Sequence, residues 1–342
     1  MTKEQKDNLF VLIKSLSKSE KRQFKLYVGR LGVNEDSKFL MLFNILEKLP
    51  FYDESTILKK GVVKKQQLSN LKAHLYKQIL ISLRLNPSHQ NIRIQIREQL
   101  DFATILYHKG LYKQSLKILD KAKSLAIANE EKNIAYEIVE LEKVIESQYI
   151  TRSISSRADE LTIQAKELSQ QNVLASKLSN LSLQLYGLFL KTGYVKNDKE
   201  NKRITKYFND RLPKYNINTL GFREKLWLYN AYLWYSFLTQ DFLSCYKYSS
   251  KWVTLFYDNK DQIVLNPVFF LKGNHYLLES LFYLRHYEKF KSTLNDLETI
   301  TKESWFPLDD NVEGLAFLYV YNNKFNLHFI EGSFQEGLPM VQ

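Results

Sequence analysis

The side chains best suited to catalysis or metal binding are sparse in this sequence. Its six histidines are His74, His89, His108, His275, His286 and His328. No two of them are four residues apart, and none has a cysteine partner at the spacing of a zinc site. The single cysteine, Cys245, falls on the packing face of an expected helix, where a buried and inert thiol is typical. We therefore expect neither a metal site nor a cysteine nucleophile.

The acidic residues and the glycines also lack a catalytic arrangement. Glu137, Glu140 and Glu142 lie near Lys132 and Lys143, and we expect them on an exposed helix in weak ion pairs. The sequence contains neither a glycine-rich turn for phosphate binding nor a Gly-x-Ser-x-Gly nucleophile elbow. It therefore predicts a protein that is not an enzyme and uses no cofactor.

The composition favours long helices over tight hairpins of strands. Of 342 residues, 44% are hydrophobic, and only 11 are glycine and 6 proline. The N-terminal segment is polar, and no apolar run approaches the ~20 residues of a membrane span. One cysteine cannot form an intramolecular disulfide. We therefore expect an all-α protein in the cytoplasm, without membrane association.

The net charge of +12 is concentrated near the N-terminus. Residues 1–90 contain 17 Lys and Arg against 8 Asp and Glu, whereas residues 91–342 contain 32 against 29. A lysine-rich solvated surface is one explanation of this excess. The other is a patch that attracts an acidic partner or a nucleic acid.

Residues 1–87 are expected to form a small basic helical bundle. Ser17 and Glu20 fit a capping box, in which each side chain accepts a hydrogen bond from the backbone of the other, so a helix should begin there. A later helix should end before Pro87, because the residue before proline avoids helical geometry. Its apolar stripe consists of Leu68, Leu71, Leu75 and Ile79. Two shorter helices are expected at 38–49 and 54–60.

After residue 92 the pattern predicts pairs of helices. The first pair covers residues 92–109 and 113–129 and is joined by a turn at Gly110. Small residues fall where the two helices must approach closely, at Ala103, Ser115 and Ala122. This stretch resembles one tetratricopeptide (TPR) unit, as in bacterial-type helical repeat proteins. The resemblance implies an α-hairpin solenoid over residues 92–342.

The second helix of this unit has packing residues that are three, four and three positions apart, and the same spacings recur in later helices of the chain. Its anchoring aromatic residues Phe242, Tyr287 and Phe334 lie 45 and 47 residues apart. Weaker signals place further helices at 158–165, 173–192 and 199–212, giving about six units that are longer than the usual TPR. Trp252 stands where a small residue is usual, which implies wider helix separation or a related helical-hairpin solenoid.

The last unit is expected to be incomplete. Its first helix should cover residues 311–330, but only nine residues remain from Phe334 onward, and Pro339 interrupts them. A solenoid normally closes with a polar-faced cap. Either the array is truncated at the C-terminus, or the chain ends there with an irregularly packed segment.

Aromatic residues are concentrated in Phe222–Phe290, with 20 among 69 positions. Most should be buried between helices, and some could line a recognition groove. The helix at 223–239 is aromatic nearly all round, so both of its faces should meet protein or a ligand.

The TPR resemblance implies that the first helices of successive units line a concave binding face. Lys272 on that face could meet a carboxylate, and asparagine side chains could clamp a peptide backbone because they both donate and accept hydrogen bonds. The positions projected onto this face are Tyr107, Gln184, Asn230, Trp234, Lys272, His275, Asn322 and Asn326.

Two classes of function follow. The first is a non-enzymatic scaffold or adaptor that binds protein or peptide on the concave face. The alternative is a transcription-type regulator whose basic N-terminal bundle binds nucleic acid while the repeats sense a partner. The basic residues of that bundle include Lys18, Lys21, Arg22, Lys25, Lys59, Lys60, Lys64 and Lys65.

Overall fold

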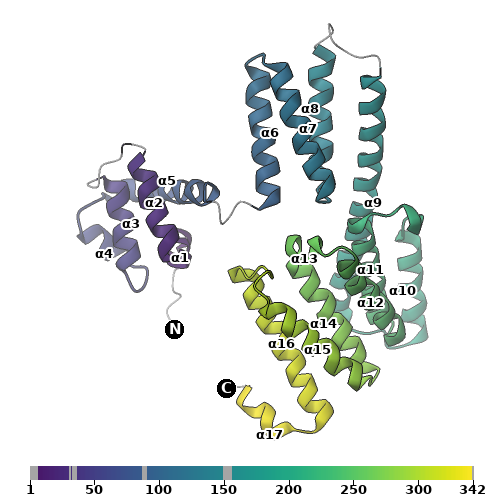
Figure 1. Cartoon of the computed structure of the whole chain (residues 1–342). Coiled ribbons are helices and arrows are strands. Elements are labelled where there is room, and N and C mark those ends of the chain that lie inside the picture. The colour runs from purple at the N-terminus through teal and green to yellow at the C-terminus, as the bar shows by residue number, and fades with distance from the viewer. Residues whose placement is uncertain (1–6, 31, 33–36, 87–90, 149–155, 341–342) are drawn as a thin grey trace. The chain divides into compact units, whose positions relative to one another are not determined.

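The fold is all-α, as the sequence predicts. The computed structural model describes residues 7–30, 32, 37–86, 91–148 and 156–340, and every regular element in these ranges is helical (Figure 1). The chain divides into two compact units, Met1–Gln95 and Ile96–Gln342. None of the described helices combines the length and the apolar character needed to cross a membrane.

The first unit is a helical bundle with its own hydrophobic core. The predicted capping box is confirmed: the Ser17 amide donates to Glu20 Oε2 at 2.6 Å, and the Glu20 amide donates to Ser17 Oγ at 3.2 Å. The helix at Asn8–Ser15 was not predicted, yet it buries Leu9 in the core. Pro87, the predicted stop, lies outside the described residues. The helices are α1 (Asn8–Ser15), α2 (Lys18–Arg30), α3 (Lys38–Lys48), α4 (Glu54–Lys59) and α5 (Lys65–Arg84).

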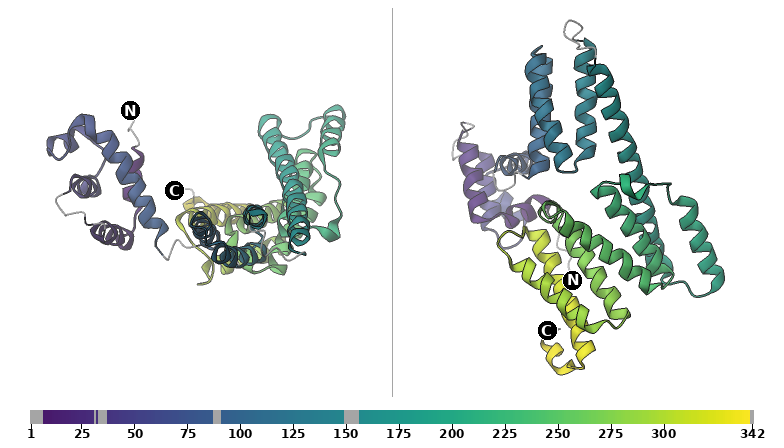
Figure 2. Two further views of the ribbon diagram at one scale, coloured as in Figure 1. Left: turned by 90° about the horizontal axis from the view of Figure 1, so that it is seen from above. Right: turned by 45° about the vertical axis from the view of Figure 1, so that its right-hand side comes forward.

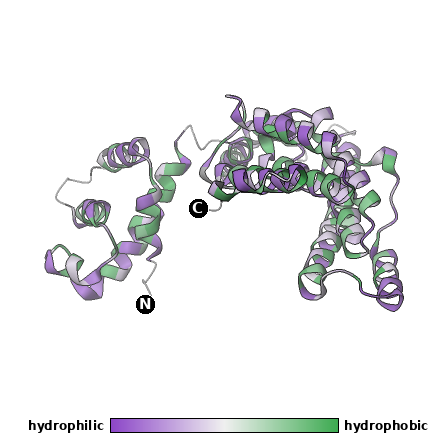
Figure 3. Ribbon diagram, turned by 90° about the horizontal axis from the view of Figure 1, so that it is seen from below, coloured by the Kyte–Doolittle hydropathy of each residue, from purple (hydrophilic) through white to green (hydrophobic). Residues whose placement is uncertain are grey.

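The second unit consists of successive helical hairpins. Its helices combine apolar and polar residues, which the hydropathy colouring shows as green and purple segments of the ribbon (Figure 3), whereas α11 (Phe222–Leu238) is buried nearly all round. The helices are α6 (Ile92–His108, beginning just before the unit boundary), α7 (Tyr112–Ala128), α8 (Lys132–Gln148), α9 (Arg157–Thr192), α10 (Asp198–Arg211), α11 (Phe222–Leu238), α12 (Phe242–Asp258), α13 (Asp261–Leu265), α14 (Pro267–Tyr283), α15 (Tyr287–Lys302), α16 (Asp310–Glu331) and α17 (Phe334–Gly337), with 3₁₀ turns η2 (Ile217–Thr219) and η3 (Leu338–Met340).

One turn geometry recurs between the two helices of a hairpin. A residue with left-handed backbone stands two positions before the second helix, at Gly110, Gln240, Arg285 and Gly332. The next amide then donates to a carbonyl five residues earlier, as from Leu111 to Leu106 at 2.9 Å. This is the Schellman motif, which satisfies carbonyls left free at a helix end. The last three turns recur at intervals of 45 and 47 residues, which matches the repeat seen in the sequence.

Helix α9 departs from the predicted repeat pattern. Separate helices were expected near residues 158–165 and 173–192, but Arg157–Thr192 is one continuous helix of 36 residues (Figure 2). The segment contains no proline and only one glycine, Gly187, so nothing local ends the helix. Helix α9 therefore serves as the second helix of one hairpin and the first helix of the next.

The prediction for the acidic cluster of α8 is wrong at Glu142. This carboxylate is fully buried. It forms ion pairs with Lys123 Nζ at 2.6 Å and with Arg157 Nη2 at 3.1 Å. Burial raises the pKa of Glu142, while the hydrogen bond from Lys123 and the two positive charges oppose the increase. The three residues belong to α7, α8 and α9, so a buried charge network joins consecutive helices.

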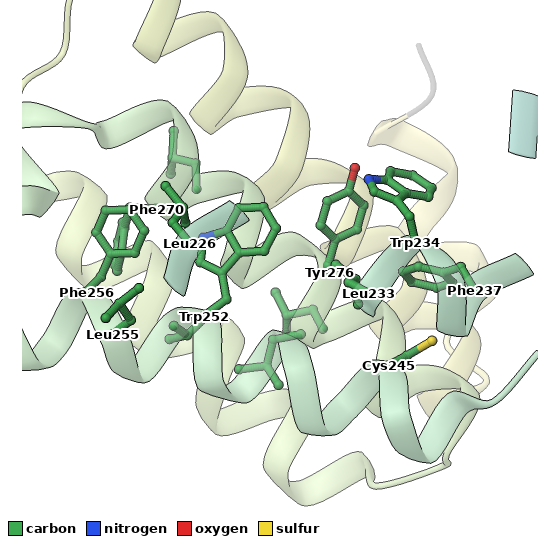
Figure 4. Close-up of a cluster of buried hydrophobic side chains, with 14 of the residues drawn as sticks. Leu226, Leu233, Trp234, Phe237, Cys245, Trp252, Leu255, Phe256, Phe270 and Tyr276 are labelled. Carbon is green, nitrogen blue, oxygen red and sulfur yellow. The ribbon is translucent and has the colours of Figure 1, made fainter. Parts of the chain in front are cut away.

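The core of the second unit is centred on aromatic residues of α11, α12 and α14 (Figure 4). Helix α11 packs against both α9 and α12, which confirms that its two faces meet protein. Trp252 is fully buried, and a Cβ added to Gly273 would lie 2.9 Å from its ring. The large residue of α12 is thus accommodated by a glycine on α14, so a wider separation of all helices is unnecessary.

The C-terminal hairpin has a full first helix and a short second one. Helix α16 covers the predicted residues 311–330 and ends at Gly332, whose φ of 69° is left-handed. The second helix lasts only from Phe334 to Gly337, and Pro339 falls within the 3₁₀ turn η3. Proline does not support continuation of an α-helix, which explains the early end.

We predict that Gly110→Ala lowers the stability of the second unit by about 1 kcal/mol, because an alanine is strained at its φ of 73°. No atom lies within 4 Å of the added Cβ, so the loss reports backbone strain alone. Gly187→Ala is the matched control: its added Cβ also meets open space, but it lies inside α9 and should stabilise by up to about 1 kcal/mol.

Urea unfolding followed by tryptophan fluorescence measures both changes. All four tryptophans, Trp227, Trp234, Trp252 and Trp305, belong to the second unit. Equal effects of the two alanines would contradict the turn assignment.

Candidate functional site

A row of aromatic side chains connects four helices of the second unit. Tyr186 of α9 lies 4.7 Å from Trp234 of α11, measured between ring centroids, and Trp234 lies 5.4 Å from Tyr276 of α14. The adjacent His275 stacks on Tyr319 of α16 at 4.6 Å. Helices α11, α14 and α16, with the C-terminal half of α9, are the first helices of their hairpins. We call these five residues the aromatic row.

Lys272 lies beside this row. Its Nζ is 5.8 Å from the ring centroids of both Tyr186 and Tyr276. Among the described residues no carboxylate forms an ion pair with it. Its side chain is half-buried, and this burial lowers its pKa. The two tyrosine rings stabilise the cation in part, but a desolvated ammonium group still favours an anionic ligand.

His275 is held between two polar neighbours, Asn323 and Glu279. The amide nitrogen of Asn323 is 3.3 Å from His275 Nδ1, and Glu279 Oε1 is 3.4 Å from His275 Nε2. Because the side-chain nitrogen of Asn323 can only donate, Nδ1 accepts, and the proton of the neutral ring resides on Nε2, the ring nitrogen nearer to Glu279. Helices α14 and α16 are thereby linked at the centre of the site.

Burial shifts both titratable groups toward their neutral forms. The pKa of His275 falls to about 4 because of burial and the positive charge of Lys272. Burial raises the pKa of Glu279 to about 7, although 31% of its side chain remains exposed. A recessed but solvent-accessible carboxylate of this kind changes its charge near neutral pH.

The structure brings together three of the residues projected onto the concave face, Trp234, Lys272 and His275. Trp234 is only 5% exposed. Its ring therefore packs beneath the row and offers a ligand little surface. Asn230 is 2% exposed and lies in the core, where its Oδ1 has no hydrogen-bond partner among the described residues. A direct contact from Asn230 to a partner therefore has no support in the structure.

The other projected residues lie apart from this cluster. Tyr107 donates to Gln148 at 3.0 Å, and Gln184 accepts from Tyr207 at 3.0 Å on the side of α9 that faces α10. Asn322 is exposed and Asn326 is half-buried. The buried asparagine that contacts His275 is the neighbouring residue, Asn323.

Five residues of the site were missed from the sequence: Tyr186, Tyr276, Glu279, Tyr319 and Asn323. Glu279 follows His275 by four residues, and this spacing places two side chains on one helix face. The spacing was therefore a usable signal. Tyr186 and Tyr319 belong to distant segments of the chain, and nothing local indicates that they meet α14.

Two features that the sequence analysis considered for chemistry are the cysteine and a metal-binding cluster. Cys245 is fully buried, and burial raises the pKa of its thiol, which disfavours the reactive thiolate. No group of three or more His, Cys, Asp or Glu side chains in the described ranges could hold a metal ion. The arrangement of one unpaired cation, aromatic rings and polar groups is suited to recognition.

We predict that Glu279→Gln raises the melting temperature at about pH 8 and has little effect at about pH 5. A carboxyl whose folded pKa lies above its ordinary value of 4.5 stabilises the fold in its protonated form. That contribution is complete below about pH 4.5 and is lost as the pH rises through 7, where glutamine remains neutral.

Thermal unfolding followed by tryptophan fluorescence tests this dependence. Glu288→Gln, at an exposed position of α15, is the control. A melting temperature that responds to both substitutions in the same way at both pH values would contradict the assignment.

Comparisons of the whole chain with protein-family models, with curated proteins and with solved structures find no match. The TPR resemblance therefore rests on residues of this sequence, such as Ala103, Gly110 and Ser115. The Ser115 hydroxyl donates to the Ala103 carbonyl at 2.8 Å, so these small residues do mark a close approach of α6 and α7.

Proposed function

We propose that the second unit is a non-enzymatic, TPR-like scaffold or adaptor of the cytoplasm that binds a protein segment along the aromatic row. The observation that carries this proposal is Lys272, a half-buried cation that lies between Tyr186 and Tyr276 without a carboxylate partner among the described residues. A ligand carboxylate would supply the missing charge. Either an acidic side chain or the C-terminus of the ligand provides that group.

The shape of the row favours an extended ligand. Its members come from α9, α11, α14 and α16, so the surface crosses successive hairpins. The partly exposed rings of Tyr186 and Tyr319 present apolar area with little entropy to lose, which suits protein recognition, and the buried Trp234 and Tyr276 support them from below. The polar groups of His275 and Glu279 can exchange hydrogen bonds with the ligand next to the carboxylate.

We predict that Lys272→Met weakens binding of selected peptides about tenfold or more. A charge-assisted hydrogen bond contributes roughly 1.5–3 kcal/mol, and tenfold corresponds to about 1.4 kcal/mol. Peptides are selected from a random display library on the full chain, and their affinities are measured by fluorescence anisotropy.

Lys177→Met, at an exposed position of α9, is the matched control and should leave the affinities unchanged. Selected peptides without any enrichment in carboxylates, or an equal response to both methionines, would exclude Lys272 as the recognition residue.

A second candidate function concerns the first unit. Lys59, Lys60, Lys64 and Lys65 flank the turn between α4 and α5, are exposed, and pair with no acid in the described part of the chain. By contrast, Lys25 pairs with Glu47 at 3.0 Å. Four unpaired lysines at one turn could contact the phosphates of a nucleic acid.

We predict for this candidate that the full chain binds duplex or single-stranded nucleic acid, and that binding weakens as salt increases. Lys64→Glu combined with Lys65→Glu should reduce that affinity. A phosphate that no lysine neutralises keeps its condensed counterion, so fewer counterions are released on binding and the gain in entropy is smaller. A titration at low and high salt measures it. Binding that is absent, or that is insensitive to salt, eliminates this function.

A further inference from the structure

The second unit has another candidate binding surface, a groove between α9 and α10. Its volume is about 530 Å³, and it is lined by Gln184, Gly187, Leu188, Lys191, Arg203, Ile204 and Tyr207. A neighbouring depression of about 240 Å³ shares Lys191, Arg203 and Ile204 with it. The two hollows therefore adjoin each other near the C-terminal end of α9.

The groove is held open by defined contacts. Helix α10 is anchored by Phe208, whose ring stacks on Tyr235 of α11 at 4.3 Å. At the groove itself, the Tyr207 hydroxyl donates to Gln184 across the gap at 3.0 Å. Gly187 contributes no side chain, and a Cβ built there would meet no atom within 4 Å. The space between the helices is thus a feature of the packed structure.

The floor of the groove is apolar, and its rim is basic. Leu188 and Ile204 supply the floor, while Lys191 and Arg203 are exposed at the edge and pair with no acid among the described residues. Glu200, at the end of the groove, accepts from the Lys196 amide at 3.0 Å through Oε2, and it forms no ion pair with Lys191 or Arg203 among the described residues. The two cations therefore remain available to an external anionic group.

The exposed side of α9 extends the apolar surface beyond the groove. Leu183 and Leu190 are 67% and 65% exposed. Their spacing from Gly187 is four and three residues, so the three positions form one stripe along the helix. These two leucines therefore add exposed apolar area next to the groove.

We propose that this groove binds an acidic amphipathic helix of a partner protein. Apolar side chains at positions i, i+3 and i+4 of that helix would enter between Leu188 and Ile204. Its carboxylates would pair with Lys191 and Arg203 at the rim. Net basic charge at the edge and an apolar floor together select this ligand over a basic or an extended polar segment.

This site is separate from the aromatic row. Tyr186 faces Trp234 of α11, whereas Gln184, Gly187 and Lys191 face α10. The inference does not depend on the function proposed for Lys272, and either can fail without the other.

The test uses a display library of amphipathic helices whose apolar positions are fixed and whose polar positions are randomised, selected on the full chain. We expect enrichment of Asp and Glu. The variant with Lys191→Glu and Arg203→Glu should bind the selected helices at least about tenfold more weakly. Gly187→Gln should weaken them similarly by filling the groove, without lowering the melting temperature.

Lys177→Glu, elsewhere on α9, and Lys272→Met, at the aromatic row, are the controls and should leave these affinities unchanged. The proposal is overturned if no helix is selected, if the selected helices are not acidic, or if the charge-reversed variant binds them as tightly as the original chain.

Discussion

The structure of residues 96–342 depends on burial of apolar side chains between consecutive hairpins. A single α-hairpin has too little interior to stabilise itself, so each one relies on the faces of its neighbours. Trp252 illustrates this, since its ring on α12 is buried against α14, and Gly273 provides the space. Any feature that sets the spacing of the hairpins therefore influences the whole array.

Two devices set that spacing. The left-handed turns at Gly110, Gln240, Arg285 and Gly332 reverse the chain within a few residues and satisfy the helix-end carbonyls. Between hairpins, the buried carboxylate of Glu142 joins three helices through Lys123 and Arg157. Removal of Glu142 would leave the buried Lys123 with the exposed Asp120 as its remaining acidic partner among the described residues, so such a network favours one arrangement of the helices.

The same architecture generates both proposed binding surfaces. Stacked hairpins bring Tyr186, Trp234 and Tyr276 from three helices into contact, and Lys272 is left beside them without a carboxylate from the described residues. Between α9 and α10 a groove opens, and the cations at its rim have no acidic partner in the described ranges. Both surfaces combine apolar area with uncompensated positive charge, and for that reason both are assigned to acidic partners.

The sequence alone determined the fold class, the limits of helices such as α3, α6 and α7, the capping box at Ser17 and Glu20, and the placement of Lys272 and His275 on one face. These features depend on residues close together in the chain, where periodicity, caps and turn residues act. Tertiary structure decided the rest. Successive residues of a helix differ by about 100° in direction, so the choice of Asn323 over Asn322 required the packing of α16 on α14. The burial of Glu142 and the meeting of Tyr186 with Trp234 depend on how distant helices cross, which no local pattern specifies.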